Sequence, residues 1–492
     1  MSLFSIDFTE KFLRPFGNSF SISSGNGGVG VFHFLWKNPN HLIQVSTFFV
    51  PMIVAVDDTD SIRGNCTTFL ATEIIKELFD FDLIGNPRLI RLNPAVPWKT
   101  RGNGSLVMEF GIGKGEKHLI GIIDGKEIFC FDESEEINVD FNSIIKRIIP
   151  LIEKYHESDA NPGCVISSGK PDPVFYKKGL YTILRRSDVD SELERIGASV
   201  FTIGNGMGLI GCTCGMAWIP KDSTYELLAY RMPEKWGTPR SFESQSIRKM
   251  DFDYPSTFNS WEEREQKVAM VPSTPCPVLY GLRGDVMEDL IPASESIISE
   301  EKYRWMIFLT NQGTDDHIRT EFDTLVPNSS YLLRGTVISY AERIRGGHSF
   351  IDIDTDFGKI TCGAYEPSKE FRYVFDHLIP GDVVEVMGEY REDPSTLNVE
   401  KIHVISLEKE RKKVSNPICP NCGKPMHSVG KNQGYRCKPC HTKSNDCVYE
   451  DVFRWIVPGW YEPPTAARRH LSKPLKRMGL EQLIEFVNCR NE

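Results

Sequence analysis

The sequence predicts a multidomain α+β protein with an OB-fold barrel and a zinc ribbon in its C-terminal part. The chain has 492 residues, which is too long for one hydrophobic core, so three or four domains are expected. Helical and strand patterns are mixed up to about residue 325, and five strands with short turns follow. Two C-x-x-C motifs near the C-terminus complete the pattern.

The charge is distributed unevenly along the chain. The net charge of −10 argues against a uniformly basic nucleic-acid-binding protein. However, residues 408–492 carry +7, whereas residues 1–407 carry −17. A basic C-terminal module on an acidic body suggests a local contact with a polyanion. The alternative is a solvated basic tail.

Cysteine usage and hydropathy indicate a cytoplasmic protein. Nine of the thirteen cysteines are scattered, mostly singly, in apolar segments, which is typical of reduced thiols rather than a disulfide framework. No uninterrupted apolar stretch reaches the length of a membrane span. We therefore expect no membrane contact, and the sequence indicates no protein partner.

Residues 1–51 are rich in Ser, Gly, Asn and Phe and have no sustained period. No basic region precedes a compact apolar run, so a signal peptide is not predicted. We expect an N-terminal extension that is either disordered or an artefact of an upstream start site, and we assign it no chemistry.

The stretch 53–68, IVAVDDTDSIRGNCTT, is the centre of the predicted site. Ile53–Val56 predict a buried strand, three carboxylates stand at its end, and a Gly-containing turn leads into a helix over 67–79. Carboxylates hold Mg²⁺ together with waters and phosphate oxygens, and a helix N-terminus attracts phosphate. The pattern favours a nucleotide-phosphate site over a solvated acidic turn with an N-cap. Its residues are Asp57, Asp58, Asp60, Gly64, Asn65, Thr67 and Thr68.

Residues 93–104 form a predicted loop with two prolines and two glycines. Its Lys99, Arg101 and Asn103 are typical of a clamp for a polyphosphate or an RNA backbone, although a solvated surface loop is the alternative. Further along, the Gly-rich segment 204–211 predicts a tight turn, and the polar residues 311–317 after a strand suggest the rim of a site.

The strands expected at 331–339, 348–353, 358–364, 382–391 and 396–405, with a helix around 367–377, match an OB-fold. OB barrels bind nucleic acid through charge and exposed aromatics, which makes Arg334 and Arg343 candidate contacts. A purely structural barrel is the alternative.

Cys419, Cys422, Cys437 and Cys440 have the spacing of paired zinc knuckles. Four thiolates complete a tetrahedral Zn²⁺ site, so the zinc is expected to be structural and required for folding, with a redox dithiol as a distant second interpretation. Basic residues around the knuckles and in the following segment suit an RNA backbone, or they are simply solvated. The candidates are Arg436, Lys438, Arg468 and Arg469.

Six motifs occur in order: DDTDS-x-RG-x-CTT, PRLIRLNPAVPWKTRGNG, GNGMGLIG, CPVLYGLRG, NQGTDDH and ARRHLSKPL. With the OB-like block and the ribbon, this set resembles the archaeal 2-agmatinylcytidine synthetase family over about residues 52–477. The resemblance implies an ATP-dependent ligase that joins agmatine to C2 of the wobble cytidine of the minor isoleucine tRNA. A phosphorylated cytidine is the implied intermediate, and ATP is consumed to AMP.

The resemblance also implies the domain organisation. It predicts a threonine–cytidine kinase-like ATP-binding domain at 52–172, a ferredoxin-like domain at 173–325 and the OB-fold at 326–408. The zinc ribbon at 415–450 and a basic C-terminal segment at 451–492 follow. Two other functions compete with this one: a non-catalytic nucleic-acid-binding protein and a small-molecule kinase.

By resemblance, Thr67 is phosphorylated during the reaction, and Asp57, Asp58 and Asp60 act in catalysis, the first two as Mg²⁺ ligands. The phosphate-binding set is Gly64, Asn65, Thr68, Lys99, Arg101 and Asn103. The agmatine pocket is expected near Gly206, Asp315 and Asp316. The chain departs from the family pattern at Cys212, Cys214 and Cys276 and at Ser273–Pro275, where His-Gly-Pro is usual, and residues 1–51 have no counterpart.

Overall fold

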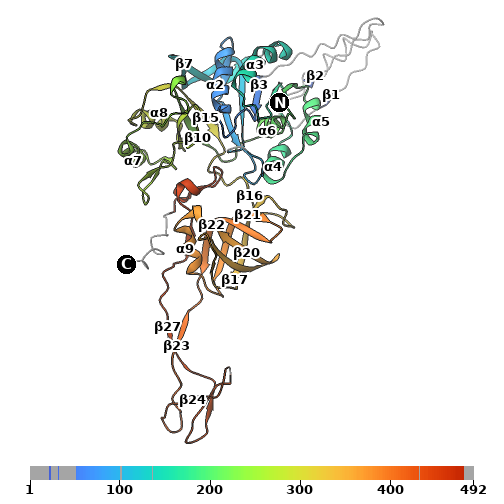
Figure 1. Ribbon diagram of the computed structural model, residues 1–492. Coiled ribbons are helices and arrows are strands. Elements are labelled where there is room, and N and C mark those ends of the chain that lie inside the picture. Colours follow the sequence, from blue (N-terminus) through green and yellow to red (C-terminus); the bar gives the residue numbers. More distant parts are fainter. Residues whose placement is uncertain are drawn as a thin grey trace, which may run out of the picture.

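A computed structural model of the chain describes residues 51–480, except 100–101, 136 and 432, together with two short paired strands, β1 Ile22–Ser23 and β2 Val31–Phe32. The remainder of the expected N-terminal extension lies outside the described residues. Figure 1 shows an α/β body (residues 51–317), a barrel beneath it (residues 329–406), and a narrow stalk that ends in the ribbon.

One eleven-stranded sheet runs through the whole α/β body. Its main order is β11-β14-β10-β15-β5-β6-β3-β8-β9, and β4 and β7 pair at the side of β6. The first half comprises β3 Met52–Asp57, β4 Asp82–Ile84, β5 Arg88–Arg91, β6 Gly104–Ile123, β7 Lys126–Glu135, β8 Gly163–Ser167 and β9 Ser199–Thr202. The second half comprises β10 Thr224–Arg231, β11 Thr257–Phe258, β14 Val278–Gly284 and β15 Lys302–Thr310. The two halves join where β15 pairs with β5, in parallel, and with β6.

Helices cover both faces of this sheet, as the alternation in β3 requires. Met52, Val54 and Val56 pack on one face and Ile53 and Ala55 on the other. The first face carries α2 Thr67–Glu77, α3 Phe141–Tyr155, α7 Ser244–Asp253 and α8 Met287–Glu295. The second carries α4 Val174–Tyr181, α5 Ser187–Arg195 and α6 Gly208–Met216. A small hairpin of β12 Trp261–Glu262 and β13 Lys267–Val268 precedes β14.

The directions of the strands determine which strand ends lie together at one edge of the sheet. Because β3 and β5 both run antiparallel to β6, they are parallel to each other. Strand β15 is parallel to β5, and β14 and β15 both run antiparallel to β10. The carboxyl ends of β3, β5, β15 and β14 therefore lie at one edge of the sheet, together with the start of β10. Ligands of open α/β sheets commonly bind at such an edge.

The predicted OB-fold is confirmed as a closed five-stranded barrel. It consists of β17 Ser329–Val337, β19 Ser349–Thr355, β20 Gly358–Ala364, β21 Val383–Arg391 and β22 Thr396–Ser406, and α9 Phe371–Asp376 lies between β20 and β21. The pairing of β17 with β19 closes the barrel. Two short strands, β16 Ile318–Arg319 and β18 Glu342–Arg343, extend it.

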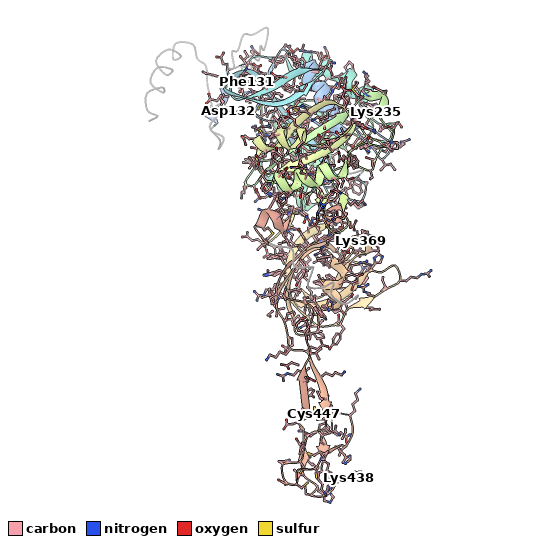
Figure 2. The ribbon with its side chains drawn as sticks, turned by 90° about the vertical axis from the view of Figure 1, so that its left-hand side faces the viewer. Phe131, Asp132, Lys235, Lys369, Lys438 and Cys447 are labelled. Atoms are coloured by element: carbon pink, nitrogen blue, oxygen red, sulfur yellow. The ribbon has the colours of Figure 1, made fainter. Side chains whose placement is uncertain are left out.

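The stalk is the antiparallel pair β23 Arg411–Ser415 and β27 Val448–Asp451, and it carries the ribbon strands β24 His427–Ser428, β25 Tyr435–Arg436 and β26 Lys443–Ser444. Figure 2 places Lys438 at the far end of the ribbon. After the stalk the chain turns back. We call residues 459–480 the return segment: its strand β28 Gly459–Tyr461 pairs with β22, and its 3-10 turns are Thr465–Ala467 and Leu475–Met478.

Two further expectations concern cysteines and membranes. No cysteine in the described part of the chain forms a disulfide, and six of these twelve residues lie buried in the sheet layers or the barrel. Within the same residues, no helix has the length and apolar character needed to cross a membrane.

Candidate active site

A cavity of about 420 Å³ opens at the sheet edge where the strand ends gather. Parts of the chain that are far apart in sequence line it. The acidic stretch contributes Asp57, Asp58, Asp60 and Cys66–Thr68, and the 93–104 loop contributes Lys99 and Asn103. The second half of the sheet contributes Glu226 and Arg283, and the return segment contributes His470. The structure thus brings seven of the predicted catalytic and phosphate-binding residues to one cavity.

Asp57 and Asp58 form the acidic wall of the cavity. Burial raises the pKa of Asp57 well above its usual value, and the neighbouring Asp58 carboxylate raises it further. The pKa of Asp58 is also raised, first by burial, although the Asn161 amide donates to its Oδ2 (3.3 Å). Neighbouring carboxylates repel each other when ionised, and a bound cation relieves this repulsion.

Asp57 is held in place by helix α6. A Cβ on Gly211 would lie 1.6 Å from Asp57 Oδ2, and one on Gly208 would lie 2.6 Å from the Asp57 carbonyl oxygen. Only glycine permits this approach of α6 to the end of β3. The Gly-rich segment 204–211 therefore forms a tight strand–helix turn and the packing surface for Asp57.

Thr67 begins α2 and presents its hydroxyl to the acidic wall. The Thr59 hydroxyl donates to Thr67 Oγ1 (3.0 Å), and the Thr67 hydroxyl donates to Asp60 Oδ1 (3.3 Å). Thr67 and Thr68 are buried, yet both line the cavity. This hydroxyl is thus oriented by two partners beside the carboxylates.

The Gly64–Asn65 turn has a structural role. Asn65 adopts a positive φ of 54° and donates through Nδ2 to Glu157 Oε1 (2.9 Å). A Cβ on Gly64 would lie 3.0 Å from the same Glu157 oxygen. Neither residue is among those that line the cavity, and the phosphate contacts predicted for them stay a prediction.

The described part of the 93–104 loop contributes to the lining of the cavity. Lys99 lines it and donates to the Pro94 carbonyl, and desolvation lowers its pKa. Asn103 has a positive φ and donates to the Asn93 carbonyl (2.9 Å), so it shapes the loop as well as lining the cavity. The predicted Arg101 lies outside the described residues.

A second set of charged residues lines the cavity, and sequence reasoning did not connect this set with the acidic stretch. Arg283 Nε donates to Glu226 Oε1 (3.0 Å), and Glu226 Oε2 accepts from Gln312 Nε2 (2.5 Å). Arg91 Nε donates to Gln312 Oε1 (3.3 Å), and Arg283 Nη2 donates to His470 Nδ1 (3.2 Å). Arg91, Arg283, Gln312 and His470 each lie in one of the family motifs, and only Glu226 has no motif that marks it.

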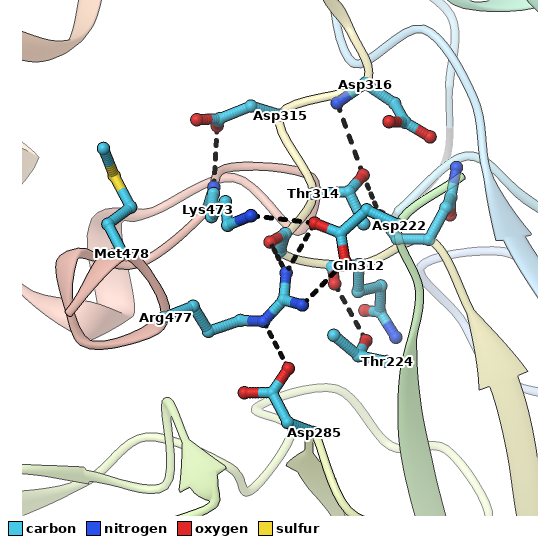
Figure 3. Close-up of polar contacts among 12 residues, drawn as sticks. Asp222, Thr224, Asp285, Gln312, Thr314, Asp315, Asp316, Lys473, Arg477 and Met478 are labelled. Atoms are coloured by element: carbon cyan, nitrogen blue, oxygen red, sulfur yellow. Dashed lines mark hydrogen bonds and ion pairs between the residues drawn. The ribbon is translucent and has the colours of Figure 1, made fainter. Parts of the chain in front are cut away.

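The structure places the residues predicted to bind agmatine outside this cavity. Asp315 accepts from Lys401 Nζ (2.8 Å) and from the Lys473 amide (2.7 Å), and Asp316 accepts from the Tyr176 hydroxyl (2.7 Å). Figure 3 shows Asp315 beside Lys473 of the return segment. The polar cluster after β15 therefore anchors other segments. Gly206 precedes α6 at a positive φ of 66°.

The residues predicted to bind RNA fall into two groups. Arg334, Arg436 and Lys438 are exposed, and Arg343 is exposed but paired with Asp376. In contrast, Arg468 pairs with Glu462 (2.9 Å), and Arg469 pairs with Glu389 (2.5 Å) and Glu400 (3.1 Å). These last two guanidinium groups bind within the protein.

The four ribbon cysteines fit a zinc ion. Their sulfurs all lie within 4.8 Å of one another, with Cys419–Cys440 at 3.3 Å and Cys422–Cys437 at 3.4 Å. Four sulfurs at a Zn–S distance of about 2.3 Å in a tetrahedron stand roughly 3.8 Å apart, close to these values. The donor set is complete, so the zinc is structural.

Family models match almost the entire described chain. They are the TiaS TCKD domain over residues 53–205, the TiaS FLD domain over 206–317, an OB-fold nucleic acid binding domain over 331–405 and the TiaS C-terminal zinc ribbon domain over 416–456. A relative from Archaeoglobus fulgidus, named as the isoleucine-tRNA 2-agmatinylcytidine synthetase TiaS, is 41% identical over 446 residues, which cover 87% of this chain and 98% of the relative. The chain belongs to the TiaS family.

Solved TiaS structures have the same fold. A complex of TiaS with its isoleucine tRNA and ATP matches with a TM-score of 0.75 at 37% identity, and a complex of TiaS with that tRNA, AMPCPP and agmatine matches with 0.73 at 35%. Each match covers 88% of this chain and 98% of the chain in the solved structure. The family resemblance found in the sequence is confirmed. The TiaS models assign residues 173–205 to the first domain, as does the pairing of β9 with β8, whereas we expected them in the second.

Proposed function

We propose that this chain is an ATP-dependent ligase that joins agmatine to C2 of the wobble cytidine, position 34, of the minor isoleucine tRNA. The product is 2-agmatinylcytidine, which reads AUA. The observation that carries the proposal is the Thr67 hydroxyl, which hydrogen-bonds to Asp60 within a cavity lined by Asp57 and Asp58. An RNA scaffold has no need of such an arrangement.

The cytosine C2 oxygen is a poor leaving group, and its phosphorylation makes displacement by an amine possible. Phosphoryl transfer depends mainly on positioning and on charge neutralisation. In the proposed reaction, Lys99, Arg91 and Arg283 supply positive charge opposite the carboxylates. Thr67 is the residue that becomes phosphorylated, and Thr59 and Asp60 orient its hydroxyl. The amino group of agmatine then attacks C2, and phosphate leaves.

The acidic wall suits Mg²⁺. Mg²⁺ is usually held by one or two carboxylates, with waters and substrate phosphates completing the octahedron. Asp57 and Asp58 supply two carboxylates whose repulsion a cation relieves. When bound, the ion would neutralise charge on the ATP phosphates. The remaining steps proposed here belong to the side chains of the cavity.

The tRNA is too large for the cavity and needs an extended surface. We assign part of that surface to Arg334 and Arg343 of the barrel and to Arg436 and Lys438 of the ribbon, because these side chains are exposed. Lys438 stands at the far end of the ribbon (Figure 2). A tRNA substrate and the free thiols are consistent with a cytoplasmic location.

The decisive experiment supplies labelled ATP, agmatine and an unmodified transcript of the minor isoleucine tRNA, with Mg²⁺ and zinc present. We expect AMP and a modified cytidine, each dependent on all three substrates. ADP as the sole nucleotide product would indicate a small-molecule kinase. tRNA binding with no ATP turnover would indicate a non-catalytic nucleic-acid-binding protein.

A further inference from the structure

His470 reaches the cavity from a part of the chain that follows the barrel and the ribbon. The return segment first adds β28 to the barrel, where Tyr461 is opposite Ile402. It then passes along the α/β body, where the Gly313 amide donates to the His470 carbonyl (2.8 Å) and the Asp315 amide donates to the Leu471 carbonyl (2.8 Å). The segment that brings His470 to the cavity is therefore attached to the barrel.

Ion pairs fasten the return segment to the α/β body. Lys473 Nζ binds Asp222 Oδ2 (2.8 Å), and Arg477 binds Asp222 Oδ1 (2.9 Å) and Asp285 Oδ1 (2.7 Å). Figure 3 shows these contacts converging on Asp222, with Asp315 holding the Lys473 amide nearby. Arg477 is largely buried, so these pairs are screened less than surface pairs.

Other contacts fasten the same segment to the barrel. Arg469 binds Glu389 and Glu400, and barrel residue Lys401 donates to the Lys473 carbonyl (2.7 Å). Arg469 and His470 are adjacent in the chain, yet the first side chain contacts the barrel and the second lines the cavity. A shift of the barrel relative to the body would therefore act directly on His470.

His470 is neutral and accepts a hydrogen bond. Arginine only donates, so the contact from Arg283 Nη2 (3.2 Å) requires an unprotonated Nδ1 and places the ring proton on Nε2. The His470 side chain is partly exposed to solvent, and its position beside Arg91, Arg283 and Lys99 favours the uncharged ring by lowering its pKa. The geometry of the contact with Arg283 therefore assigns a neutral acceptor.

The hydrogen bond from Arg283 completes a chain across the cavity wall. It runs from His470 through Arg283, Glu226 and Gln312 to Arg91. Glu226 fixes one edge of the Arg283 guanidinium group, and His470 fixes another. With both contacts in place, Arg283 has little freedom to turn away from the cavity.

We propose that His470 is a positioning residue for the ligase reaction: it orients Arg283 toward the nucleotide phosphates, and the barrel-anchored return segment sets its position. This inference rests on the proposed function, because Arg283 is taken to bind the phosphates of ATP. The barrel thereby contributes to the geometry of the cavity in addition to binding nucleic acid.

The test compares three single variants of the full-length, zinc-loaded protein. His470→Asn keeps an acceptor near the position of Nδ1, His470→Phe keeps the ring but removes the acceptor, and Ala466→Ser is a control in the same segment, outside the cavity lining. The readouts are AMPCPP binding by calorimetry, kcat and KM for ATP, and tRNA binding. We expect His470→Phe to weaken AMPCPP binding and kcat/KM for ATP about ten-fold, the loss expected for one hydrogen bond to a charged group.

His470→Asn should restore both quantities to within about three-fold of the wild type, and tRNA binding should be equal in all variants. Arg469→Gln, which weakens the barrel anchor, should lower kcat/KM in the same direction by less. Equal AMPCPP binding by His470→Phe and the wild type, or equal losses in the Asn and Phe variants, would overturn the inference. A wild-type protein that binds AMPCPP but forms no AMP with tRNA and agmatine would instead count against the proposed function.

Discussion

Replacing Gly211 by alanine tests whether the position of Asp57 governs catalysis. The new Cβ would lie 1.6 Å from Asp57 Oδ2, whereas ordinary contact begins at 3.4 Å. Either the carboxylate or helix α6 must therefore move by roughly 2 Å, and misplacements of about 1 Å can cost about 100-fold in rate. We expect AMP formation to fall about 100-fold and overpacking to destabilise the protein by about 1–3 kcal/mol.

The assay measures AMP and modified tRNA under single-turnover conditions, alongside thermal unfolding and tRNA binding. Gly169→Ala is a matched control, because its Cβ would meet Ile196 Cβ at 3.1 Å, outside the cavity. The control should retain nearly full activity, and Gly211→Ala should still bind tRNA. Wild-type AMP formation by a folded Gly211→Ala variant would refute the reasoning that Asp57 must occupy its present position.

Four further outcomes are expected. Asp58→Asn should abolish ATP turnover with tRNA affinity within about two-fold of the wild type in a filter-binding assay. Thr67→Val should still bind AMPCPP but form neither phosphothreonine, by mass spectrometry, nor product. Cys437→Ser should lose zinc, measured by elemental analysis, and weaken tRNA binding about ten-fold or more, and retained zinc would contradict the assigned ligand set. The pKa of Asp57 is raised in the folded state, so this carboxyl group lowers the stability of the fold at every pH above the unfolded pKa of about 3.9. Asp57→Asn should therefore raise the melting temperature at about pH 7.5. This gain should shrink as the pH falls toward about 4.

Local patterns predicted the parts of the molecule that local interactions determine. The apolar run before Asp57, the helix from Thr67 and the strands of the barrel follow from side-chain periodicity, and the ribbon follows from cysteine spacing. Glycines weaken a strand pattern, yet the long strand β6 runs through Gly111 and Gly113 without a break. A Cβ on Gly111 would lie 2.0 Å from Ser134 Oγ, so glycine permits close pairing with β7.

The meeting of the second set of charged residues with the acidic stretch was not predictable in this way. Arg91, Glu226, Arg283 and His470 come from four segments that meet only because β15 pairs with β5 and the return segment comes back to the body. The polar run around Asp315 is a second place where sequence pattern did not predict the partners of a side chain. Short polar side chains after a strand suit a ligand, but Lys401 and Lys473 satisfy Asp315 within the protein, and sequence pattern does not distinguish these partners.

The topology explains why the acids of the cavity and Arg283 belong to different halves of one sheet. Burial and the neighbouring carboxylates raise the pKa of Asp57, and Arg91 of β5 is the charged residue within the same half that opposes this shift. Joining β15 to β5 brings Arg283 and Glu226 to the same edge, and the return segment adds His470 to Arg283. The acidic stretch therefore depends on residues that are far away in the sequence. Separating the halves should remove Arg283 and Glu226 from the cavity while leaving Arg91 and the Asp57–Thr67 arrangement in place.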